Sequence, residues 1–314
     1  MAKKLHFRED GTFKIVQFTD VHWGESGDEK DGLSRRLMEL VLDAEKPDLV
    51  VFTGDTIVGV RCPDGMAAYR QAVAAVEERG LVWAAVFGNH DDEGGTAPVP
   101  KRSLMEVQEQ SEFGIGEAGP DEVYGVGNYV VEVASKEDGL TKAALYFLDS
   151  GAYAPEIGGY DWIKTSQIEW YSKLSAAYKA QNGGTPLPSL AFFHIPIPEY
   201  QEVWEKSVCY GSKWERVCCS KVNSGLFAAM LENGDITGTF VGHDHINDFC
   251  GEHYGIRLCY GRASGYSTYG REGFPRGARV IKLKAGERGF ESWLRLDDGS
   301  VVEAQDEHMP ETSE

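Results

Sequence analysis

Five short polar segments of this chain contain residue types that bind metal ions. They combine carboxylates, imidazoles and one amide with glycines, and each directly follows an apolar run that predicts a strand. Carboxylate, amide oxygen and imidazole together suit Mn²⁺, Fe or Zn²⁺, and glycine lets the backbone turn tightly beside an ion. One such segment is weak evidence, but five in succession indicate a metal site. The segments are Asp20-Val21-His22, Gly54-Asp55, Gly88-Asn89-His90-Asp91, His194 and Gly242-His243-Asp244-His245.

The apolar runs beside the first three segments predict the scaffold that positions them. Residues 13–18, 48–52 and 81–87 predict buried strands, whereas residues 33–44 and 65–79 predict helices. This alternation predicts parallel strands joined by right-handed crossovers. Ligands in open α/β sheets bind where the carboxyl ends of the strands meet. The three polar segments are therefore expected to converge at one edge of a sheet.

The rest of the chain continues the α/β pattern more loosely. No repeat, linker or low-complexity block divides it, so we predict one domain over residues 1–301. The acidic residues 302–314 are expected to form a flexible tail. Residues 248–296 indicate antiparallel hairpins, with 285–289 as one turn. Further strands are predicted at 129–133, 144–148, 189–193 and 236–241, and helices at 101–112, from a cap at Thr165 or Ser166 to about 180, and at 223–231.

Composition excludes several classes of function. Of the 314 residues, 42% are hydrophobic and 26% are charged, which is typical of a globular protein with a sizeable core. The net charge of −19 argues against nucleic-acid binding and against docking on anionic membranes. The longest apolar run, 81–87, is too short to cross a bilayer, and no apolar stretch follows residues 1–4. We therefore expect no membrane association and a cytoplasmic location.

The six cysteines form no C-x-x-C pair, so a structural zinc ribbon is not expected. Reduced thiols in a cytosolic protein are the simplest interpretation, and a disulfide is the alternative for an extracellular chain. Neither the pairing of the cysteines nor the oligomeric state follows from the sequence.

Taken together, the five segments resemble the motifs of the calcineurin-like metallophosphoesterases. The pattern of that family is D-x-H, G-D, G-N-H-[D/E], H and G-H-x-H, and every element occurs between residues 13 and 283. The resemblance implies a four-layer α/β/β/α sandwich, with two mixed sheets face to face and helices outside. It also implies two metal ions, the first held by Asp20, His22 and His245, the second by Asn89, His194 and His243, with Asp55 bridging both.

The same resemblance implies hydrolysis of a phosphate ester, either a small molecule or a phosphoprotein. The nucleophile would be a hydroxide between the ions, since two metals can lower the pKa of water and clamp the attacking and leaving oxygens. His90 would contact the phosphate and protonate the leaving group, with Asp91 orienting its imidazole. A phosphodiesterase or nucleotidase with the same site is an alternative. A metal-binding interaction module without turnover is another, against which the complete ligand set argues.

A narrower resemblance, over residues 222–225, 242–249, 260–262 and 277–279, is to purple acid phosphatase-like proteins of plants and related fungal phosphatases. Some of these proteins are labelled inactive, but the present chain keeps every ligand, so we interpret it as active. True purple acid phosphatases have a tyrosine at the position of Val58, three residues after the bridging aspartate. They also lack a histidine at the position of His22. A purple ferric site is therefore not expected here.

Other residues near these motifs could act at the site or only pack. Arg262, Arg276 and Arg279 could bind a phosphate or form surface salt bridges. Asn247 and Asp248 could orient ligands, whereas Asp244 is expected to point away. Five aromatic residues could line a cleft, although packing is the simpler role for most of them: Tyr153, Tyr160, Trp162, Tyr266 and Tyr269.

Overall fold

The fold is built on two mixed β-sheets, seen here in a computed structural model that describes residues 5–24, 28–94 and 99–310. Within these residues, six strands form the smaller sheet. Three of its strands pair in parallel, as their βαβ sequence pattern predicts. In spatial order the strands are β14 (Val301–Val302), β13 (Glu291–Leu296), β12 (Gly277–Lys284), β2 (Thr12–Phe18), β3 (Leu49–Thr53) and β4 (Trp83–Val86).

The larger sheet has nine strands among the described residues. Its centre is parallel, and an antiparallel hairpin extends it, which agrees with the hairpin signal after residue 248. In spatial order the strands are β1 (Leu5–His6), β5 (Tyr129–Ala134), β6 (Thr141–Phe147), β7 (Ser189–Phe192), β9 (Ile236–Val241), β11 (Ile256–Tyr260), β10 (Cys250–His253), β8 (Cys209–Tyr210) and β15 (Glu307–His308).

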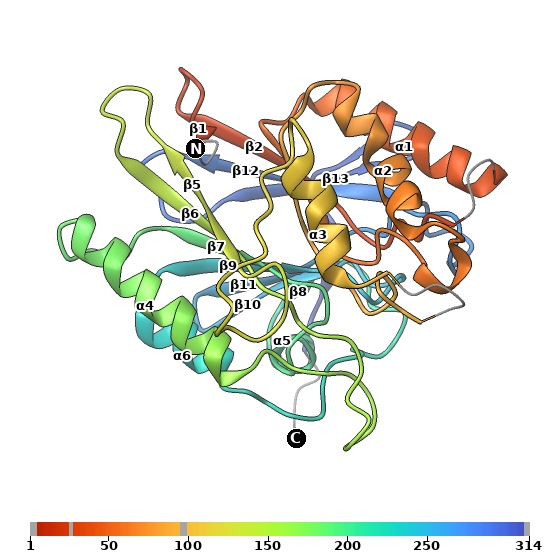
Figure 1. The fold of residues 1–314 in the computed structure, drawn as a ribbon. Coiled ribbons are helices and arrows are strands. Elements are labelled where there is room, and N and C mark those ends of the chain that lie inside the picture. Colours follow the sequence, from red (N-terminus) through yellow and green to blue (C-terminus); the bar gives the residue numbers. More distant parts are fainter. Residues whose placement is uncertain (1–4, 25–27, 95–98, 311–314) are drawn as a thin grey trace.

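Helices lie outside the two sheets, so the four-layer α/β/β/α sandwich is confirmed (Figure 1). On the side of the smaller sheet are α1 (Glu29–Glu45), α2 (Gly65–Glu77) and α3 (Lys101–Gln110). On the side of the larger sheet are α4 (Thr165–Gln181) and α6 (Leu226–Asn233), with α5 (Glu199–Lys206) packed near β10. A short 3₁₀ turn covers Gly59–Arg61. No helix in the described ranges is both long and apolar enough to cross a membrane.

Apolar side chains fill both faces of the larger sheet. Phe147, Phe192 and Phe240 stack in a row, with ring centroids 5.2 and 5.3 Å apart. They share one buried cluster with Phe18 and Phe52 of the smaller sheet, so this cluster joins the two sheets. A second cluster lies between the larger sheet and α4, α5 and α6. Because both faces are buried, the sequences of the central strands are mostly apolar.

The start of α4 differs from the expected cap at Thr165 or Ser166. The side-chain oxygen of Gln167 accepts the backbone N–H of Lys164 at 2.7 Å. The Ser166 hydroxyl instead accepts the N–H of Tyr124 at 3.1 Å, in a loop before β5. A glutamine therefore satisfies the first free N–H, and the serine serves a tertiary contact.

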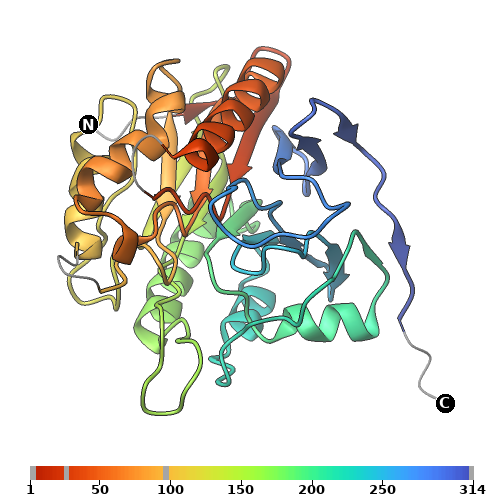
Figure 2. The same cartoon turned by 90° about the vertical axis from the view of Figure 1, so that its right-hand side faces the viewer.

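The C-terminal segment is partly ordered, where a flexible tail was expected from residue 302. Val301–Val302 pairs with β13, and Glu307–His308 pairs with β8 at the edge of the larger sheet. The His308 ring stacks on Trp204, with centroids 3.7 Å apart, and contacts its carbonyl at 2.9 Å. Figure 2 shows this dark-blue segment along one side of the molecule. Edge pairing and ring stacking hold it, while residues 311–314 lie outside the described part.

Candidate active site

The strand ends bring all seven predicted metal ligands to one side of the sandwich. The loops after β2, β3 and β4 carry the ligands from the first third of the chain, and the loops after β7 and β9 carry the remainder. Parallel pairing within each sheet explains this convergence, since the carboxyl ends of parallel strands share an edge. All seven side chains are buried: Asp20, His22, Asp55, Asn89, His194, His243 and His245.

The backbone is strained at these positions. Among the described residues, six non-glycine residues have positive φ, and four of the six are predicted ligands. They are Asp20 (φ 53°), His22 (50°), Asp55 (49°) and His243 (78°). A left-handed conformation costs an L-residue about 1–2 kcal/mol. Strain concentrated in one place is typical of functional sites, where the surrounding structure holds it.

Two motif glycines allow the ligand loops to approach one another. A Cβ on Gly88 would overlap the Asp55 carboxylate, and a Cβ on Gly242 would overlap the Thr19 hydroxyl and crowd Asp20. Any side chain at these positions would push a predicted ligand away. The glycines of the G-N-H and G-H-x-H segments are therefore part of the site's construction.

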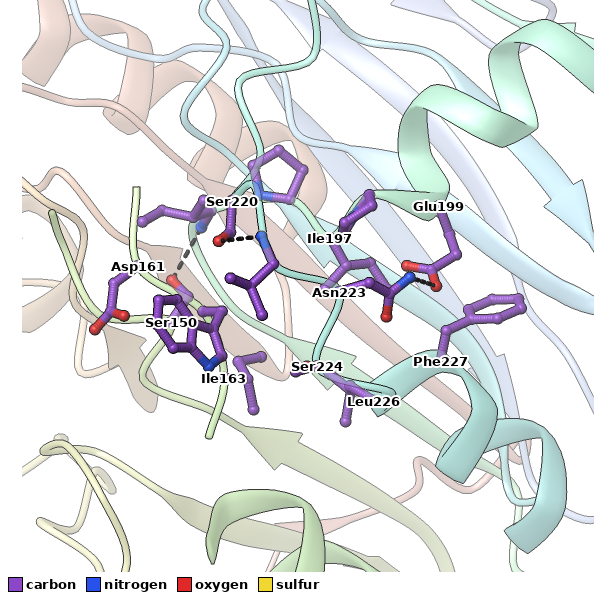
Figure 3. A pocket seen from close by; sticks show the side chains of 15 residues that line it. Ser150, Asp161, Ile163, Ile197, Glu199, Ser220, Asn223, Ser224, Leu226 and Phe227 are labelled. Atoms are coloured by element: carbon purple, nitrogen blue, oxygen red, sulfur yellow. Dashed lines mark hydrogen bonds between the residues drawn. The ribbon is translucent and has the colours of Figure 1, made fainter. Parts of the chain in front are cut away.

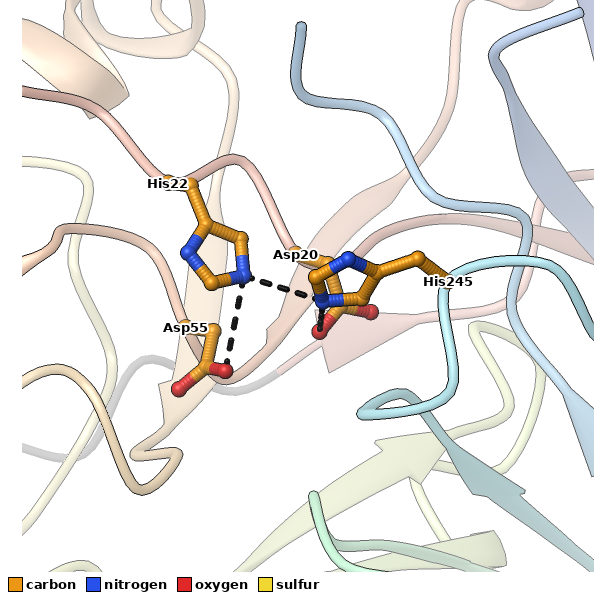
Figure 4. A group of neighbouring side chains, drawn as sticks. All are labelled: Asp20, His22, Asp55 and His245. Carbon is orange, nitrogen blue, oxygen red and sulfur yellow. Dashed lines mark hydrogen bonds and ion pairs between the residues drawn. The ribbon is translucent and has the colours of Figure 1, made fainter. Parts of the chain in front are cut away.

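One group of four potential ligand atoms comes from Asp20, His22, Asp55 and His245, which point toward one another (Figure 4). The Nε2 atoms of His22 and His245 lie 3.1 Å apart. His22 Nε2 is 3.5 Å from an Asp55 oxygen, and His245 Nε2 is 3.5 Å from an Asp20 oxygen. The Thr268 hydroxyl contacts His245 Nδ1 at 2.8 Å and so orients the ring. All four ligand atoms lie within 4.8 Å of one another.

The second group shares Asp55 with the first and adds His194 and His243. His194 Nε2 lies 3.2 Å from an Asp55 oxygen and 3.2 Å from His243 Nδ1. His194 Nδ1 donates to the Thr53 carbonyl at 2.8 Å, which leaves Nε2 to face the cluster. Asn89 lies beside this group with its amide nitrogen 3.0 Å from the Tyr153 hydroxyl. Its amide oxygen is buried and has no hydrogen-bond partner among the described residues.

These donor sets fit cations. Imidazole nitrogens and carboxylate oxygens face each other at 3.1–3.5 Å, distances that a ring proton or a bound cation between the atoms can bridge. The Asn89 side-chain oxygen has no hydrogen-bond partner among the described residues, so it is free to accept a hydrogen bond or to bind an ion. Two acceptor groups joined by one carboxylate are the arrangement expected of a two-metal site.

The pKa values of the imidazoles are consistent with ligand roles. Burial lowers the pKa of both His22 and His243 to about 3, so both rings are neutral, which is the form that binds a metal. Burial raises the pKa of Asp20, but the hydrogen bond and charge of His245 outweigh it and hold the value at about 2. Burial lowers the pKa of His194, yet the Asp55 carboxylate raises it to about 9. A cation bound there would compete with that proton.

Asp91 does not orient His90, contrary to the expectation from their adjacency. Its buried carboxylate accepts backbone N–H groups instead, and it is turned away from the imidazole. The partner of His90 is Glu93, whose carboxylate lies 2.5 Å from Nδ1. Residues 90–93 form a turn, which places the side chain three positions on, rather than the next one, beside the ring. The backbone N–H of His90 donates to an Asp55 oxygen at 2.8 Å.

Three of the five candidate aromatic residues contact predicted ligands. The Tyr153 hydroxyl meets Asn89, the Tyr160 ring meets His243 edge-on with centroids 4.3 Å apart, and the Tyr269 ring stacks on His245 at 4.1 Å. Tyr153 and Tyr269 are 46% and 52% exposed, so they form a rim that orients ligands and remains accessible.

The other two aromatic candidates lie elsewhere. Trp162 lines a small pocket beside the segment that follows His194, and the lining of this pocket includes none of the predicted ligands (Figure 3). The Tyr266 hydroxyl donates a hydrogen bond to the Asp297 carboxylate.

None of the three candidate arginines forms a surface salt bridge, and the charge of Arg276 interacts with the predicted ligand Asp20. All three are buried. Arg262 pairs with Asp248 at 2.5 Å, and Arg279 donates to the carbonyls of Tyr260 and Asp248, each at 2.6 Å. Arg276 donates to the carbonyls of Thr268 and Tyr269, the loop that contacts His245.

The polar side chains around the G-H-x-H segment also form hydrogen bonds within the protein rather than facing the ligand groups. The Asn247 side-chain oxygen accepts the N–H groups of Trp214 and Glu215. Asp244 points away from the ligand groups, as expected, and accepts the Tyr260 hydroxyl at 2.6 Å.

The fold and the shared Asp/His groups define a phosphoesterase with a dimetal-type site. The chain belongs to the calcineurin-like phosphoesterase family, whose model matches residues 13–247.

The relatives confirm the resemblance to plant and fungal proteins. The chain is 36% identical to "Probable inactive purple acid phosphatase 29" of Arabidopsis thaliana, covering 96% of this chain and 87% of the relative. It is also 36% identical to "Phosphatase DCR2" of Saccharomyces cerevisiae, covering 97% of this chain and 57% of that protein. A dimetal phosphatase from Danio rerio shares the fold, with a TM-score of 0.59, 13% identity and coverage of 89% and 98% of the two chains.

Proposed function

We propose that this protein hydrolyses phosphate esters with two bound metal ions. The observation that carries the proposal is the convergence of six buried aspartates and histidines into two groups that share Asp55, with the buried Asn89 beside the second group. In this proposal Asp20, His22 and His245 hold one ion. Asn89, His194 and His243 hold the other. Membership of the calcineurin-like phosphoesterase family also supports a hydrolase.

Two cations held by these residues would supply a nucleophile by lowering the pKa of bound water, and would neutralise charge on the phosphoryl group. The protein's own contribution is to hold the ligands, through Thr53 on His194 and Thr268 on His245. Nitrogen and oxygen ligands without thiolates suit Mn²⁺, Fe or Zn²⁺. Positive charge in the site would also offset the net charge of −19, which otherwise repels an anionic substrate.

In this proposal His90 acts on the leaving group. Its ring lies beside His22, with centroids 5.2 Å apart, and its side chain is 32% exposed, so an incoming ester can reach it. Glu93 takes Nδ1, which leaves Nε2 to donate a proton to the leaving oxygen. The substrate we propose is a small phosphate ester or a phosphoprotein.

The relatives named inactive make the test of turnover essential. Protein stripped with a chelator should hydrolyse no ester, and reloading with Mn²⁺, Zn²⁺ or Fe²⁺ should restore activity. A panel of phosphomonoesters, phosphodiesters and nucleotides on the reloaded protein would distinguish a phosphatase from a phosphodiesterase or nucleotidase.

Two results would overturn the proposal. Full activity of protein shown to be metal-free by elemental analysis would exclude metal-dependent hydrolysis. Two bound metal equivalents without hydrolysis of any ester in the panel would indicate a binding module instead.

A further inference from the structure

Two buried cysteines face each other on neighbouring strands of the larger sheet. Cys250 on β10 is the register partner of Cys259 on β11, and both carry free thiols. Cys250 is 5% exposed and Cys259 is fully buried. The proposed hydrolysis uses neither residue.

The hydrogen-bond pattern shows which kind of pair they form. In an antiparallel ladder, hydrogen-bonded and non-hydrogen-bonded pairs alternate. The N–H of Tyr260 donates to the Phe249 carbonyl at 3.0 Å, which marks that pair as hydrogen-bonded. The next pair, Cys250 and Cys259, is therefore non-hydrogen-bonded, with an expected Cα separation of about 4.5 Å and both side chains on one face. A disulfide needs about 4.4–6.8 Å between Cα atoms, so the strands already hold the thiols at bonding distance.

Positive charge lies beside the pair. The buried Arg279 guanidinium donates to the carbonyls of Asp248, two residues before β10, and of Tyr260, the last residue of β11. Burial raises the pKa of Cys250, but a hydrogen bond with Cys259 and the charges of Arg279 and Arg257 outweigh it and bring the value to about 7. Burial holds the pKa of Cys259 well above its usual range. Cys250 therefore loses its proton more readily than Cys259, and the thiolate is the form that attacks an oxidant.

A groove gives small molecules a route to Cys250. It has a volume of about 570 Å³, and its lining includes Cys250, Arg257, Arg279, Ser292 and Gln305. The groove can admit a compact oxidant, whereas Cys259 does not line it.

We propose that Cys250 and Cys259 form a disulfide when a hydroperoxide enters this groove. The Cys250 thiolate attacks one peroxide oxygen, the O–O bond breaks, and water leaves after taking up a proton, which gives a sulfenic acid. The Cys259 sulfur then attacks Cys250 Sγ, an S–S bond forms, the S–O bond breaks, and a second water carries away the Cys259 proton. With hydrogen peroxide, the two thiols lose two protons and two electrons in total, and the peroxide becomes two waters.

The linkage would lie at the base of a ligand loop. Residues 242–249, which carry His243 and His245, run from β9 directly into β10. Cys259 also pairs with Phe240 of β9, so a Cys250–Cys259 bond ties the exit of this loop to the strand beside its entrance.

Peptide mass mapping of the full-length, reduced protein tests the proposal. The protein is exposed to hydrogen peroxide, quenched in acid, denatured and alkylated. We expect one linked peptide pair containing Cys250 and Cys259, loss of two of the six alkylatable thiols, and full recovery after a dithiol reductant. Both cysteines remaining alkylatable, or Cys250 becoming sulfinic acid without a linkage, would overturn it. The wild-type map decides this without any variant.

Two variants sharpen the result. In Cys259→Ser, Cys250 should accumulate as a sulfenic acid that a cyclic 1,3-diketone traps, with no linked peptide. Cys218→Ser removes a partly exposed thiol from another loop and should leave the Cys250–Cys259 linkage unchanged. Loss of the linkage in Cys218→Ser would contradict the assignment, because it would show that Cys218 relays the oxidation.

Discussion

The carboxylate of Asp91 accepts the backbone N–H of Asp55 at 2.9 Å, so one buried aspartate fixes the loop that presents another. The same carboxylate accepts the N–H groups of Gly88 at 2.7 Å and Ile57 at 3.0 Å. It therefore clamps the loop after β3 to the loop after β4. Because Asp55 belongs to both groups of potential ligands, its position governs the whole site.

Asp91→Asn should weaken both the fold and the site. The amide keeps the size of the side chain but replaces one acceptor with a donor, so at least one buried N–H loses its partner. Such a group costs about 1–3 kcal/mol. We expect a lower free energy of unfolding in urea and reduced metal content by elemental analysis. Glu93→Gln is the control, since it should leave both unchanged. Normal stability and metal content in Asp91→Asn, with altered catalysis alone, would restore the role that adjacency to His90 suggested.

Asp55→Asn should cost at least one metal equivalent. The substitution keeps the shape but removes the negative charge between the two proposed cations, and that charge offsets their repulsion. Elemental analysis after loading and desalting measures the effect, and hydrolysis should fall with occupancy. Asp43→Asn is the matched control, because Asp43 is exposed on α1 and pairs with Arg79. Equal occupancy and rate in the two variants would show that Asp55 is not shared.

Lys101→Met should destabilise the fold strongly. Lys101 lies 2.8 Å from Asp149, with side-chain exposures of 10% and 3%. Removal of the ammonium leaves Asp149 as an uncompensated buried charge, a change that costs about 3–5 kcal/mol. Lys142→Met breaks an exposed pair with Asp138 at the same 2.8 Å and should change the unfolding free energy little. Similar losses in the two variants would show that burial does not determine the strength of these pairs.

Sequence patterns were sufficient to predict the strands that carry ligands. The runs that became β3 and β4 are apolar because both faces are buried, the β2 run alternates, and each of the three ends at a polar segment. The family resemblance carried by the motifs then implied that Asp20 and Asp55 share a metal ion before any geometry was known. The two mixed sheets followed from the family resemblance, since periodicity alone does not specify how sheets stack.

Other features depend on turn geometry or tertiary contact and left no local signal. Glu93 reaches His90 only because residues 90–93 turn. Thr268 meets His245 across a gap of 23 positions. The short helix α5 buries Tyr200 and Val203 but is too brief for a clear helical period. The polar C-terminal residues are ordered by the free edge of β8 and by the Trp204 ring, neither of which their own composition indicates.

His90→Ala should leave the metals in place and lower kcat. His90 follows a proposed ligand, yet it belongs to neither group of potential ligands, and its Nδ1 contacts Glu93. A general acid contributes about 10²–10⁴-fold, so we expect kcat to fall about 10²-fold or more for esters with poor leaving groups. The loss should shrink for nitrophenyl esters, because a good leaving group needs little protonation. A plot of log kcat against leaving-group pKa for wild type and variant measures this difference.

Glu93→Gln tests whether the charge beside His90 matters. The amide can still accept a hydrogen bond from Nδ1, but the negative charge beside the imidazole is removed, so the charge that faces the ring as it gives up its proton is lost. We expect a smaller fall in kcat than in His90→Ala, the same dependence on leaving group, and unchanged metal content. In a His90→Ala background, Glu93→Gln should then have no further effect on kcat, because its action passes through the imidazole. Parallel slopes for wild type and His90→Ala, or additive losses in the double variant, would exclude a general-acid role for His90 supported by Glu93.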